Sequence, residues 1–357
     1  PREAAAPLAL RDLADWMRHP ARYFLRTRLG VVFDRGDDAP EDAEPFHLAG
    51  LESHTVARQL LDHLPTDWAD LPDSAPRQHL GQALQRLRRA GLLPLGTPGE
   101  QLVAQWDAEW LPVLQTWQAL QRAHAQPAAR VQVCRTLQTP DAINLIAACA
   151  YQTGAKAQND HESKSALSLQ DWLDGLRCNA AGQAVWMALS PSRLLRDAKK
   201  RSLRTDLLIH PWLCNLAAAA SGTALQGLLV ARDVWLAWEP LAPEAARTQL
   251  DLWLHACSQG QSAPLPLPRR TALALLEDKS AARAAYEGTS QQDGEAQDPA
   301  WARFYPDYDA LAADGRLTQA AQALWAPLEQ WAHTAVRVHD HGAATATTAA
   351  GSTEASP

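Results

Sequence analysis

The sequence contains few cysteines and none of the short motifs that mark most nucleotide-dependent or zinc-dependent enzymes. Its five cysteines lie far apart and form no C-x-x-C pair, which argues against a disulfide framework or a zinc site and predicts reduced thiols in a cytoplasmic protein. A Walker A loop, a G-x-G-x-x-G turn and a G-x-S-x-G elbow are also missing, so no ATP, dinucleotide or hydrolase site is predicted. No apolar run approaches the roughly 18 residues of a membrane span, and no signal peptide is visible.

Positive charge is also in short supply, because the net charge is −7 at pH 7. A free-standing nucleic-acid binder would carry a basic surface, so this balance argues against one. Ser192–Arg204 is the exception: facing DNA, its cations would neutralise phosphates and give salt-sensitive, sequence-independent binding. The alternatives are a solvated loop and a rim that pairs with an acidic partner subunit. The candidate DNA-binding residues are Arg193, Arg196, Lys199, Lys200, Arg201 and Arg204.

Tyrosine and phenylalanine are scarce, with five and four copies, whereas tryptophan occurs fourteen times. Trp106, Trp110 and Trp117 recur at helical spacing within Glu100–His124, a predicted long helix. A platform for stacking bases needs exposed rings mixed with cations, so this stripe is better interpreted as a core face. Several tryptophans are therefore expected to anchor the core, with their indole N–H groups hydrogen-bonded.

Two amphipathic helices are predicted within Leu10–Phe33, separated by a kink at His19-Pro20. Apolar side chains line one face of the first helix, and an apolar stripe that includes Leu29 continues in the second. Arginines line much of the opposite side, where a subunit contact or an intradomain salt bridge is expected. This segment is predicted to be a lid over a larger core. Its candidate structural or interface residues are Trp16, Arg18, Arg22, Phe24 and Arg26.

The remaining pattern predicts an α+β fold with an α/β-like core, in which a small mixed sheet lies between helices. Helices are expected over 51–64, 75–90, 100–124, 203–220 and 243–258, and strands over 130–137, 143–151, 169–177, 183–189 and 225–238. Residues 34–44 form an acidic loop, and 152–168 a polar insertion. The chain is expected to have a helical N-terminal part (residues 1–128), an α/β core (129–268) and a C-terminal part made of helices (269–341), which a low-complexity segment at 288–298 interrupts. Residues 342–357 are expected to be a disordered tail.

Five blocks of the sequence, in the same order, resemble the carboxy-terminal domain of RecC, the gamma subunit of exodeoxyribonuclease V. They are HPARYFLRTRLGVVF (19–33), EPFHLAGLESHTVARQLL (44–61), AGLLPLGTPGE (90–100), GQSAPLPLP (260–268) and WARFYPDYDAL (301–311). None is a catalytic signature, but together they span nearly the whole chain up to residue 341. The resemblance implies a restriction-endonuclease-like core, because that domain is similar to the nuclease domain of its RecB partner.

Such a core cleaves DNA with a carboxylate on one strand and an acid-x-Lys pair on the next, which together hold Mg²⁺ and orient water. The first predicted strand contains Asp171 and Asp174, but the second, QAVWMALSPS, has no acid and no lysine. Ala188 and Ser190 stand where the acid and the lysine would be needed. Asp233 on the following strand lacks a lysine two residues on. We therefore expect a nuclease-like fold with no catalytic and no metal-binding residues.

The resemblance implies a subunit that holds RecB-type and RecD-type partners together, helps to split DNA duplex ends and channels the separated single strands, with no membrane contact. Mg²⁺ and ATP would be used by the partner subunits, so no cofactor is expected in this segment. Polar residues 152–168 are the expected protruding element. Two alternatives stay open, an active Mg²⁺-dependent nuclease that uses Asp174 and a protein–protein scaffold without DNA contact.

Overall fold

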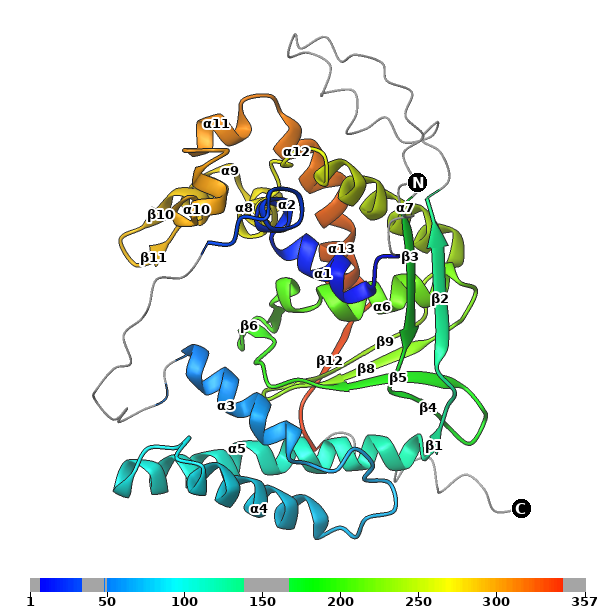
Figure 1. The fold of residues 1–357 in the computed structure, drawn as a ribbon. Coiled ribbons are helices and arrows are strands. Elements are labelled where there is room, and N and C mark those ends of the chain that lie inside the picture. Colours follow the sequence, from blue (N-terminus) through cyan, green and yellow to red (C-terminus); the bar gives the residue numbers. More distant parts are fainter. Residues whose placement is uncertain (1–6, 34–47, 49, 138–166, 343–357) are drawn as a thin grey trace.

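The computed structural model describes residues 7–33, 48, 50–137 and 167–342, and within them helices surround a six-stranded mixed β-sheet (Figure 1). In spatial order its strands are β1 (Gln126–Pro127), β4 (Leu176–Cys178), β5 (Ala184–Leu189), β8 (Gln226–Val230), β9 (Trp235–Trp238) and β12 (Arg337–His339). β5 and β8 run parallel, and the other neighbouring strands run antiparallel. The predicted α+β class with a small mixed sheet is confirmed.

The parallel pair requires a crossover connection, and this one contains helix α6 (Ile209–Ala220). Every residue of α6 except His210 is buried, as expected for a helix that is apolar on all sides. The prediction of a helix from Leu203 was wrong, because Leu203 is buried in β7 (Ser202–Leu203), where it pairs with β6 (Leu195–Asp197). A short 3₁₀ turn, η2 (Thr205–Leu207), then leads into α6.

The strand predicted over 169–177 is divided in two by Gly175, whose φ of +73° is left-handed. Its second half, β4, forms the expected hairpin with β5. Its first half, β3 (Ser168–Leu173), leaves the sheet and pairs antiparallel with β2 (Val131–Thr136) in a separate ribbon. The sequence predicted 143–151 as the partner of β2, but that stretch lies outside the described residues, and β3 pairs with β2 along its whole length.

Alternating side chains on β5 and β8 serve two different cores, one on each face of the sheet. Val185 and Val230 pack with the three helices α3 (Gly50–Asp62), α4 (Ala75–Arg89) and α5 (Gly96–Ala123), which contribute Trp106, Trp110 and Trp117. Trp186 and Leu229 pack on the opposite side with α6, with α1 (Leu10–Arg18) and with α7 (Pro243–Gly260). Figure 1 shows α5 below the sheet and α6 above it. The tryptophan stripe of α5 is thus a core face, as predicted.

A cluster of edge-to-face tryptophans lies where α1, α6 and α7 meet. Trp253 makes T-shaped contacts with Trp16, Trp212 and Trp325, with ring centroids 5.1 to 6.2 Å apart. The indole N–H groups of Trp16, Trp253 and Trp325 find no hydrogen-bond acceptor among the described residues, so the expectation of bonded indoles was wrong for them. Rings packed edge to face direct their edges at other rings rather than at carbonyl oxygens.

The C-terminal part is mostly helical, as predicted, but it returns to the sheet. Its helices are α8 (Arg269–Glu277), α9 (Lys279–Glu287), α10 (Pro299–Ala302), α11 (Tyr308–Ala312), α12 (Arg316–Ala320), the π-helical η4 (Ala321–Trp325) and α13 (Ala326–Thr334). The low-complexity stretch 288–298 forms a small hairpin, β10 (Gly288–Thr289) with β11 (Gln292–Asp293), followed by the 3₁₀ turn η3 (Glu295–Gln297). Strand β12 then pairs with β9, so the sheet takes strands from all three predicted parts of the chain.

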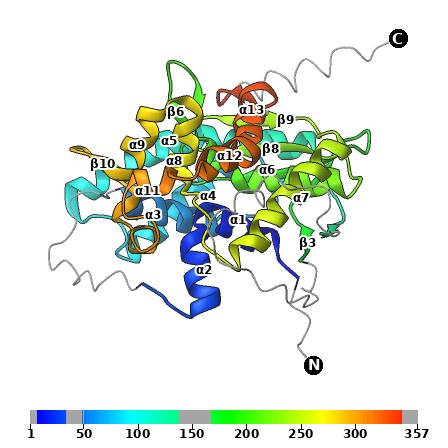
Figure 2. The ribbon, with the colours of Figure 1, turned by 90° about the horizontal axis from the view of Figure 1, so that it is seen from above.

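The lid segment has its predicted shape, with α1 followed by α2 (Pro20–Leu29). The view from above shows α2 projecting from the body of the molecule (Figure 2). Four predicted features, the acidic loop 34–44, the strand 143–151, nearly all of the polar insertion 152–168 and the tail after 342, lie outside the described residues. In the part of the chain that is described, no helix is both long and apolar enough to cross a bilayer.

Candidate functional site

The two positions at which the sequence analysis looked for an acid and a lysine, Ala188 and Ser190, lie at the end of β5 and directly after it. Ala188 packs against the core on the α6 side of the sheet. The backbone N–H of Ser190 donates to the carbonyl of Val230 over 2.8 Å, and the Ser190 hydroxyl accepts from the N–H of Ser192. Neither position supplies a carboxylate or an ammonium group, as the sequence indicated.

The three acids considered as metal ligands are each engaged with other groups. The Asp171 carboxylate, on β3, accepts from the backbone N–H groups of Leu10 and Trp172 over 2.9 and 2.8 Å, which fixes the start of α1. Asp174 is exposed and lies 3.7 Å from the Arg130 guanidinium.

Asp233 uses both of its carboxylate oxygens to accept backbone N–H groups of Leu194 and Leu195, each over 2.9 Å. These bonds tie the β8–β9 turn to β6. Mg²⁺ is usually held by one or two carboxylates together with waters and substrate oxygens. Because Asp171 and Asp233 accept backbone N–H groups and Asp174 lies beside Arg130, these three acids do not fit a magnesium site.

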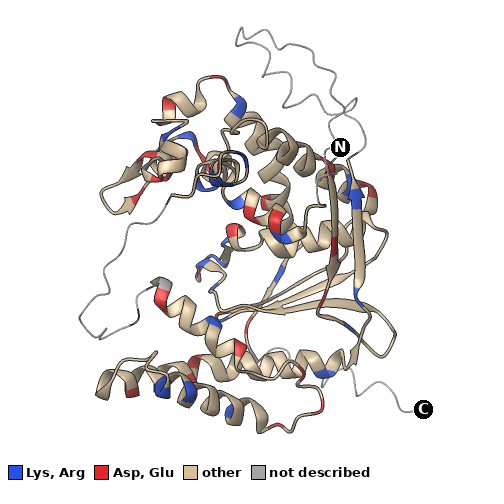
Figure 3. Ribbon diagram, in the orientation of Figure 1, with Lys and Arg blue, Asp and Glu red and all other residues tan. Residues whose placement is uncertain are grey.

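The cations of the 193–204 stretch lie on and around the β6–β7 hairpin, where Figure 3 shows Lys and Arg between the upper and lower groups of helices. Four of the six arginines and lysines lie within 4 Å of a carboxylate of the same chain. These ion pairs are Arg193–Glu109, Arg196–Glu277, Arg201–Asp340 and Arg204–Asp206. Three of the four acids are distant in sequence, so the tertiary structure brings these three pairs together, whereas Arg204 and Asp206 are neighbours in the chain.

Lys199 and Lys200 differ from these arginines, because their ammonium groups contact no carboxylate among the described residues. Both side chains are exposed in the turn between β6 and β7. The Asp197 carboxylate accepts the backbone N–H groups of both lysines, over 2.8 and 3.1 Å, and thereby shapes the turn. Arg201, with a φ of +51°, completes it. The hairpin thus presents two uncompensated positive charges at its tip.

A cleft of about 600 Å³ adjoins this hairpin, between α3, the first turns of α5 and the loop after β5. Arg193, Arg204 and Arg232 line it, together with Trp106. Arg193 and Arg232 share one carboxylate, that of Glu109 on α5. Burial would raise the pKa of Glu109, but its hydrogen bonds to these two guanidinium groups outweigh burial and lower that pKa. Two guanidinium groups on one carboxylate leave this wall of the cleft positively charged.

Arg232 was missed as a site residue by sequence reasoning, which considered it only as the neighbour of Asp233. Its side chain is 11% exposed, and its guanidinium lies over the rings of Trp106 and Trp110, 5.6 and 5.5 Å from their centroids. Nothing local to the sequence pairs Arg232 with an α5 residue more than a hundred positions earlier.

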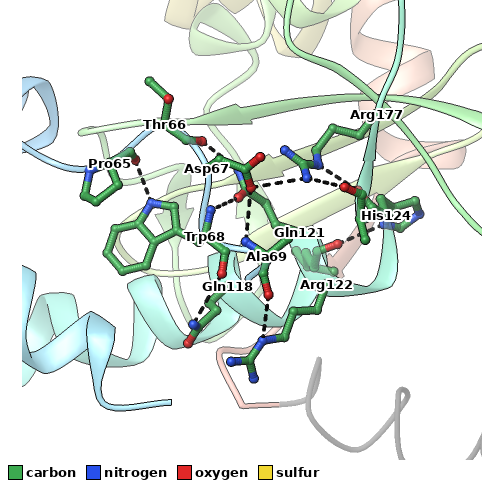
Figure 4. A network of polar contacts seen from close by, with 12 residues as sticks. Pro65, Thr66, Asp67, Trp68, Ala69, Gln118, Gln121, Arg122, His124 and Arg177 are labelled. Carbon is green, nitrogen blue, oxygen red and sulfur yellow. Dashed lines mark hydrogen bonds and ion pairs between the residues drawn. The ribbon is translucent and has the colours of Figure 1, made fainter. Parts of the chain in front are cut away.

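Arg177 is the buried cation of the β4–β5 hairpin, and it holds the helical layer rather than a ligand. Its guanidinium donates to the carbonyls of His124 and Ala125, over 2.6 and 2.7 Å, and lies 3.3 Å from Asp67 (Figure 4). In the same network Gln121 on α5 accepts the backbone N–H of Trp68. These bonds attach the loop between α3 and α4, and the end of α5, to the sheet.

The five candidates on α1 and α2 have separate roles. Trp16 and Phe24 are buried in the core, which agrees with a structural rather than a surface role. Arg18 pairs with Asp15 over 2.7 Å, and Arg22 pairs with Asp298. The Arg26 guanidinium lies over the Tyr23 ring, 5.8 Å from its centroid, and has no carboxylate partner in the described part of the chain. Leu29, predicted to continue the apolar stripe, is instead exposed, because α2 projects past the core.

The family of the chain can be stated from comparison with known sequences. A family model described as the RecC C-terminal domain matches residues 5–280. The chain belongs to this family. Four of the five resembling blocks lie inside the matched range, and the fifth, 301–311, lies beyond it.

A curated relative of this RecC C-terminal domain chain is the RecBCD enzyme subunit RecC of Escherichia coli (strain K12). The two are 27% identical over 317 residues, which cover 83% of this chain and 23% of the relative. The chain therefore spans about a quarter of the length of that curated relative.

Proposed function

We propose that this chain is the non-catalytic, nuclease-like part of a RecC-type subunit of exodeoxyribonuclease V. In this role it supports assembly with RecB-type and RecD-type subunits, the splitting of DNA duplex ends and the channelling of the separated strands during double-strand-break repair by homologous recombination. Family membership supports the subunit assignment. The observation that carries the non-catalytic part is the engagement of Asp171, Asp174 and Asp233 in backbone bonds or an ion pair, together with a strand β5 that contains no acid and no lysine.

Metal-dependent cleavage by the purified chain tests the catalytic alternative. With Mg²⁺ and linear DNA we expect no cleavage above that of a chelator control. Cleavage that Asp174→Ala abolishes, and that Asp309→Ala on α11 leaves intact, would establish an active nuclease and overturn the proposal. Mg²⁺ and ATP then belong to the partner subunits. The four described cysteines are free, in keeping with the cytoplasmic location that is part of the proposal.

DNA contact is proposed for the tip of the β6–β7 hairpin and the cleft beside it. Arg193, Arg196, Arg201 and Arg204 already have carboxylate partners, whereas Lys199 and Lys200 have none among the described residues. A phosphate that meets the two lysines releases counterions without displacing a protein carboxylate. The two lysines are therefore expected to contribute more to the salt dependence of the DNA affinity than the four arginines.

The double variant Lys199→Gln/Lys200→Gln tests this contact in the assembled complex. We expect weaker DNA binding, and a slope of log K against log salt that is smaller by about 2, one for each lost phosphate contact. Lys279→Gln on α9 is the matched control and should leave the slope unchanged. An unchanged slope in the double variant would favour the scaffold without DNA contact, which the four internal ion pairs also support.

A further inference from the structure

Exposed apolar side chains are concentrated at the end of α2. Six large apolar residues are well exposed in the described part of the chain, and four of them fall within 29–33. The most exposed is Val32, at 74%. Scattered single exposed residues are ordinary, but a contiguous group indicates a contact surface. The four are Leu29, Val31, Val32 and Phe33.

This apolar segment is held in place by the way α2 ends. Gly30 has a left-handed φ of +65°, and the N–H of Val31 donates to the carbonyl of Leu25 over 3.0 Å. This is a glycine-terminated helix end, which turns the chain back along the helix. Val31, Val32 and Phe33 thereby form one wall of a groove of about 340 Å³.

The opposite wall of the groove is cationic. It contains Arg18, Arg22 and Arg26 together with Tyr23. Arg18 and Arg22 have carboxylate partners within the chain, but Arg26 has none among the described residues. The groove therefore offers an apolar wall and a partly uncompensated positive wall, on a helix that projects from the molecule (Figure 2).

We propose that this α2 groove binds a segment of a partner protein in which carboxylates alternate with large aliphatic or aromatic side chains. Aliphatic Val31 and Val32 have nothing to offer a phosphodiester backbone, whereas they can bury the large apolar side chains of a protein segment. A symmetric second copy would bring a groove with the same positive wall, so the groove itself supplies no carboxylates for Arg26. Arginine beside a desolvated apolar anchor is the usual composition of the centre of a protein–protein interface. The inference rests on the proposed function for the identity of the partner, a subunit of the same complex.

Assembly of the full-length subunit with its RecB-type and RecD-type subunits tests the groove. In Val32→Ser and in Arg26→Glu we expect the dissociation constant of the complex to rise about tenfold or more. Leu95→Ser, an exposed leucine at the start of α5, and Arg58→Glu on α3 are the matched controls and should assemble like the wild type. Thermal unfolding of the isolated variants should match the wild type, because the replaced side chains are exposed.

Each other outcome overturns a specific statement. If the wild-type complex forms and both groove variants assemble normally, the groove is not the interface and the proposed function stands. If the wild type binds neither subunit, the proposed function and the inference fail together. If the wild type dimerises in sedimentation and Val32→Ser abolishes the dimer, the occupant is a second copy. If Arg26→Glu lowers thermal stability after all, and neutralising Asp34, Asp37 and Asp38 lowers it equally, the occupant is this chain's own acidic segment.

Discussion

Asp298 connects the N-terminal kink to the C-terminal helices. Its carboxylate accepts from His19 over 3.1 Å, from the Arg22 guanidinium and from the backbone N–H of Ala300 over 2.9 Å. Burial would raise the pKa of Asp298, but the hydrogen bonds from His19 and Arg22 outweigh it and hold that pKa well below its usual range. The imidazole of His19 also stacks on Trp301, with centroids 5.2 Å apart.

Asp298→Asn should lower the free energy of unfolding at pH 7 by about 1–3 kcal/mol, because an amide accepts fewer charge-assisted bonds. In the wild type the contribution of the lowered pKa is present above the ordinary aspartate pKa and is lost as the pH falls toward the folded-state pKa. The difference between the free energies of unfolding at pH 7 and pH 3, measured by urea titration, should therefore be smaller for the variant than for the wild type. Asp309→Asn, at an exposed pair with Arg283, is the control and should change little.

His341 makes a second contribution to the pH dependence of the protein's stability. Its ring nitrogens lie 2.9 Å from the Ala231 carbonyl and 3.3 Å from the Thr116 hydroxyl, and burial lowers the pKa of the imidazole. His341 therefore binds a proton more readily in the unfolded chain than in the folded one. Its contribution to the free energy of unfolding is fully present above the ordinary histidine pKa and is lost as the pH falls below that value.

His341→Gln should flatten the loss of stability between pH 7 and pH 5, because glutamine can keep both hydrogen bonds and does not titrate there. Unfolding free energies measured at four pH values across this range would check it. His63→Gln on the exposed surface should keep the wild-type slope. An identical slope in His341→Gln would show that the imidazole is not the titrating group.

At the scale of the elements, Gly227 shows how closely β8 and β9 pack. It pairs with Trp238, and a Cβ on Gly227 would lie 2.0 Å from an indole carbon. Trp238 is buried and contacts the rings of Trp186 and Trp331, so its ring cannot be displaced without disturbing other packed side chains. A glycine is therefore required at this position of the strand.

Gly227→Ala should destabilise the protein by about 1–3 kcal/mol or more, through displacement of a packed ring. Gly81→Ala is the matched comparison, since Gly81 lies inside α4 with no heavy atom within 4 Å of the added Cβ. That change should stabilise by about 0.5–1 kcal/mol, because alanine is the better helix former. Chemical denaturation of both variants would check that the free energy of unfolding falls in Gly227→Ala and rises in Gly81→Ala.

At the scale of the whole molecule, the end of the chain completes the sheet. β12 covers the edge of β9, and His339 stacks on Trp235 with centroids 4.1 Å apart. The Trp235 indole donates to the Asp340 carbonyl over 3.2 Å, and Arg201 pairs with the same residue. The strand therefore links the sheet, the cationic hairpin and the C-terminal helices.

A chain that ends at Ala335 should lose at least about 2 kcal/mol of stability, because it loses the β12 pairing and the aromatic stack. It should also aggregate more readily, since the edge of β9 becomes free to pair with other chains. A chain that ends at Gly342 keeps β12 and is the control. Thermal unfolding with light scattering measures both effects, and equal behaviour of the two chains would contradict the role given to β12.

The sequence by itself determined the local features. Pro20 fixes the break between α1 and α2, Gly222 follows the end of α6, and the tryptophan spacing of α5 marks a buried face. The lack of acid and lysine in β5 is likewise visible in the sequence. These features depend on a residue's own backbone freedom, on helical periodicity or on side-chain chemistry, all of which a short stretch contains.

Only the tertiary structure decided what depends on distant partners. It separated β3 from β4, brought β12 to the sheet and gave three arginines of the 193–204 stretch their carboxylates, those of Glu109, Glu277 and Asp340. It also left Leu29 exposed, although the apolar stripe of the second helix suggested that it would be buried. Strand pairing, ion pairing and burial are properties of two or more segments at once, so periodicity within one segment does not specify them.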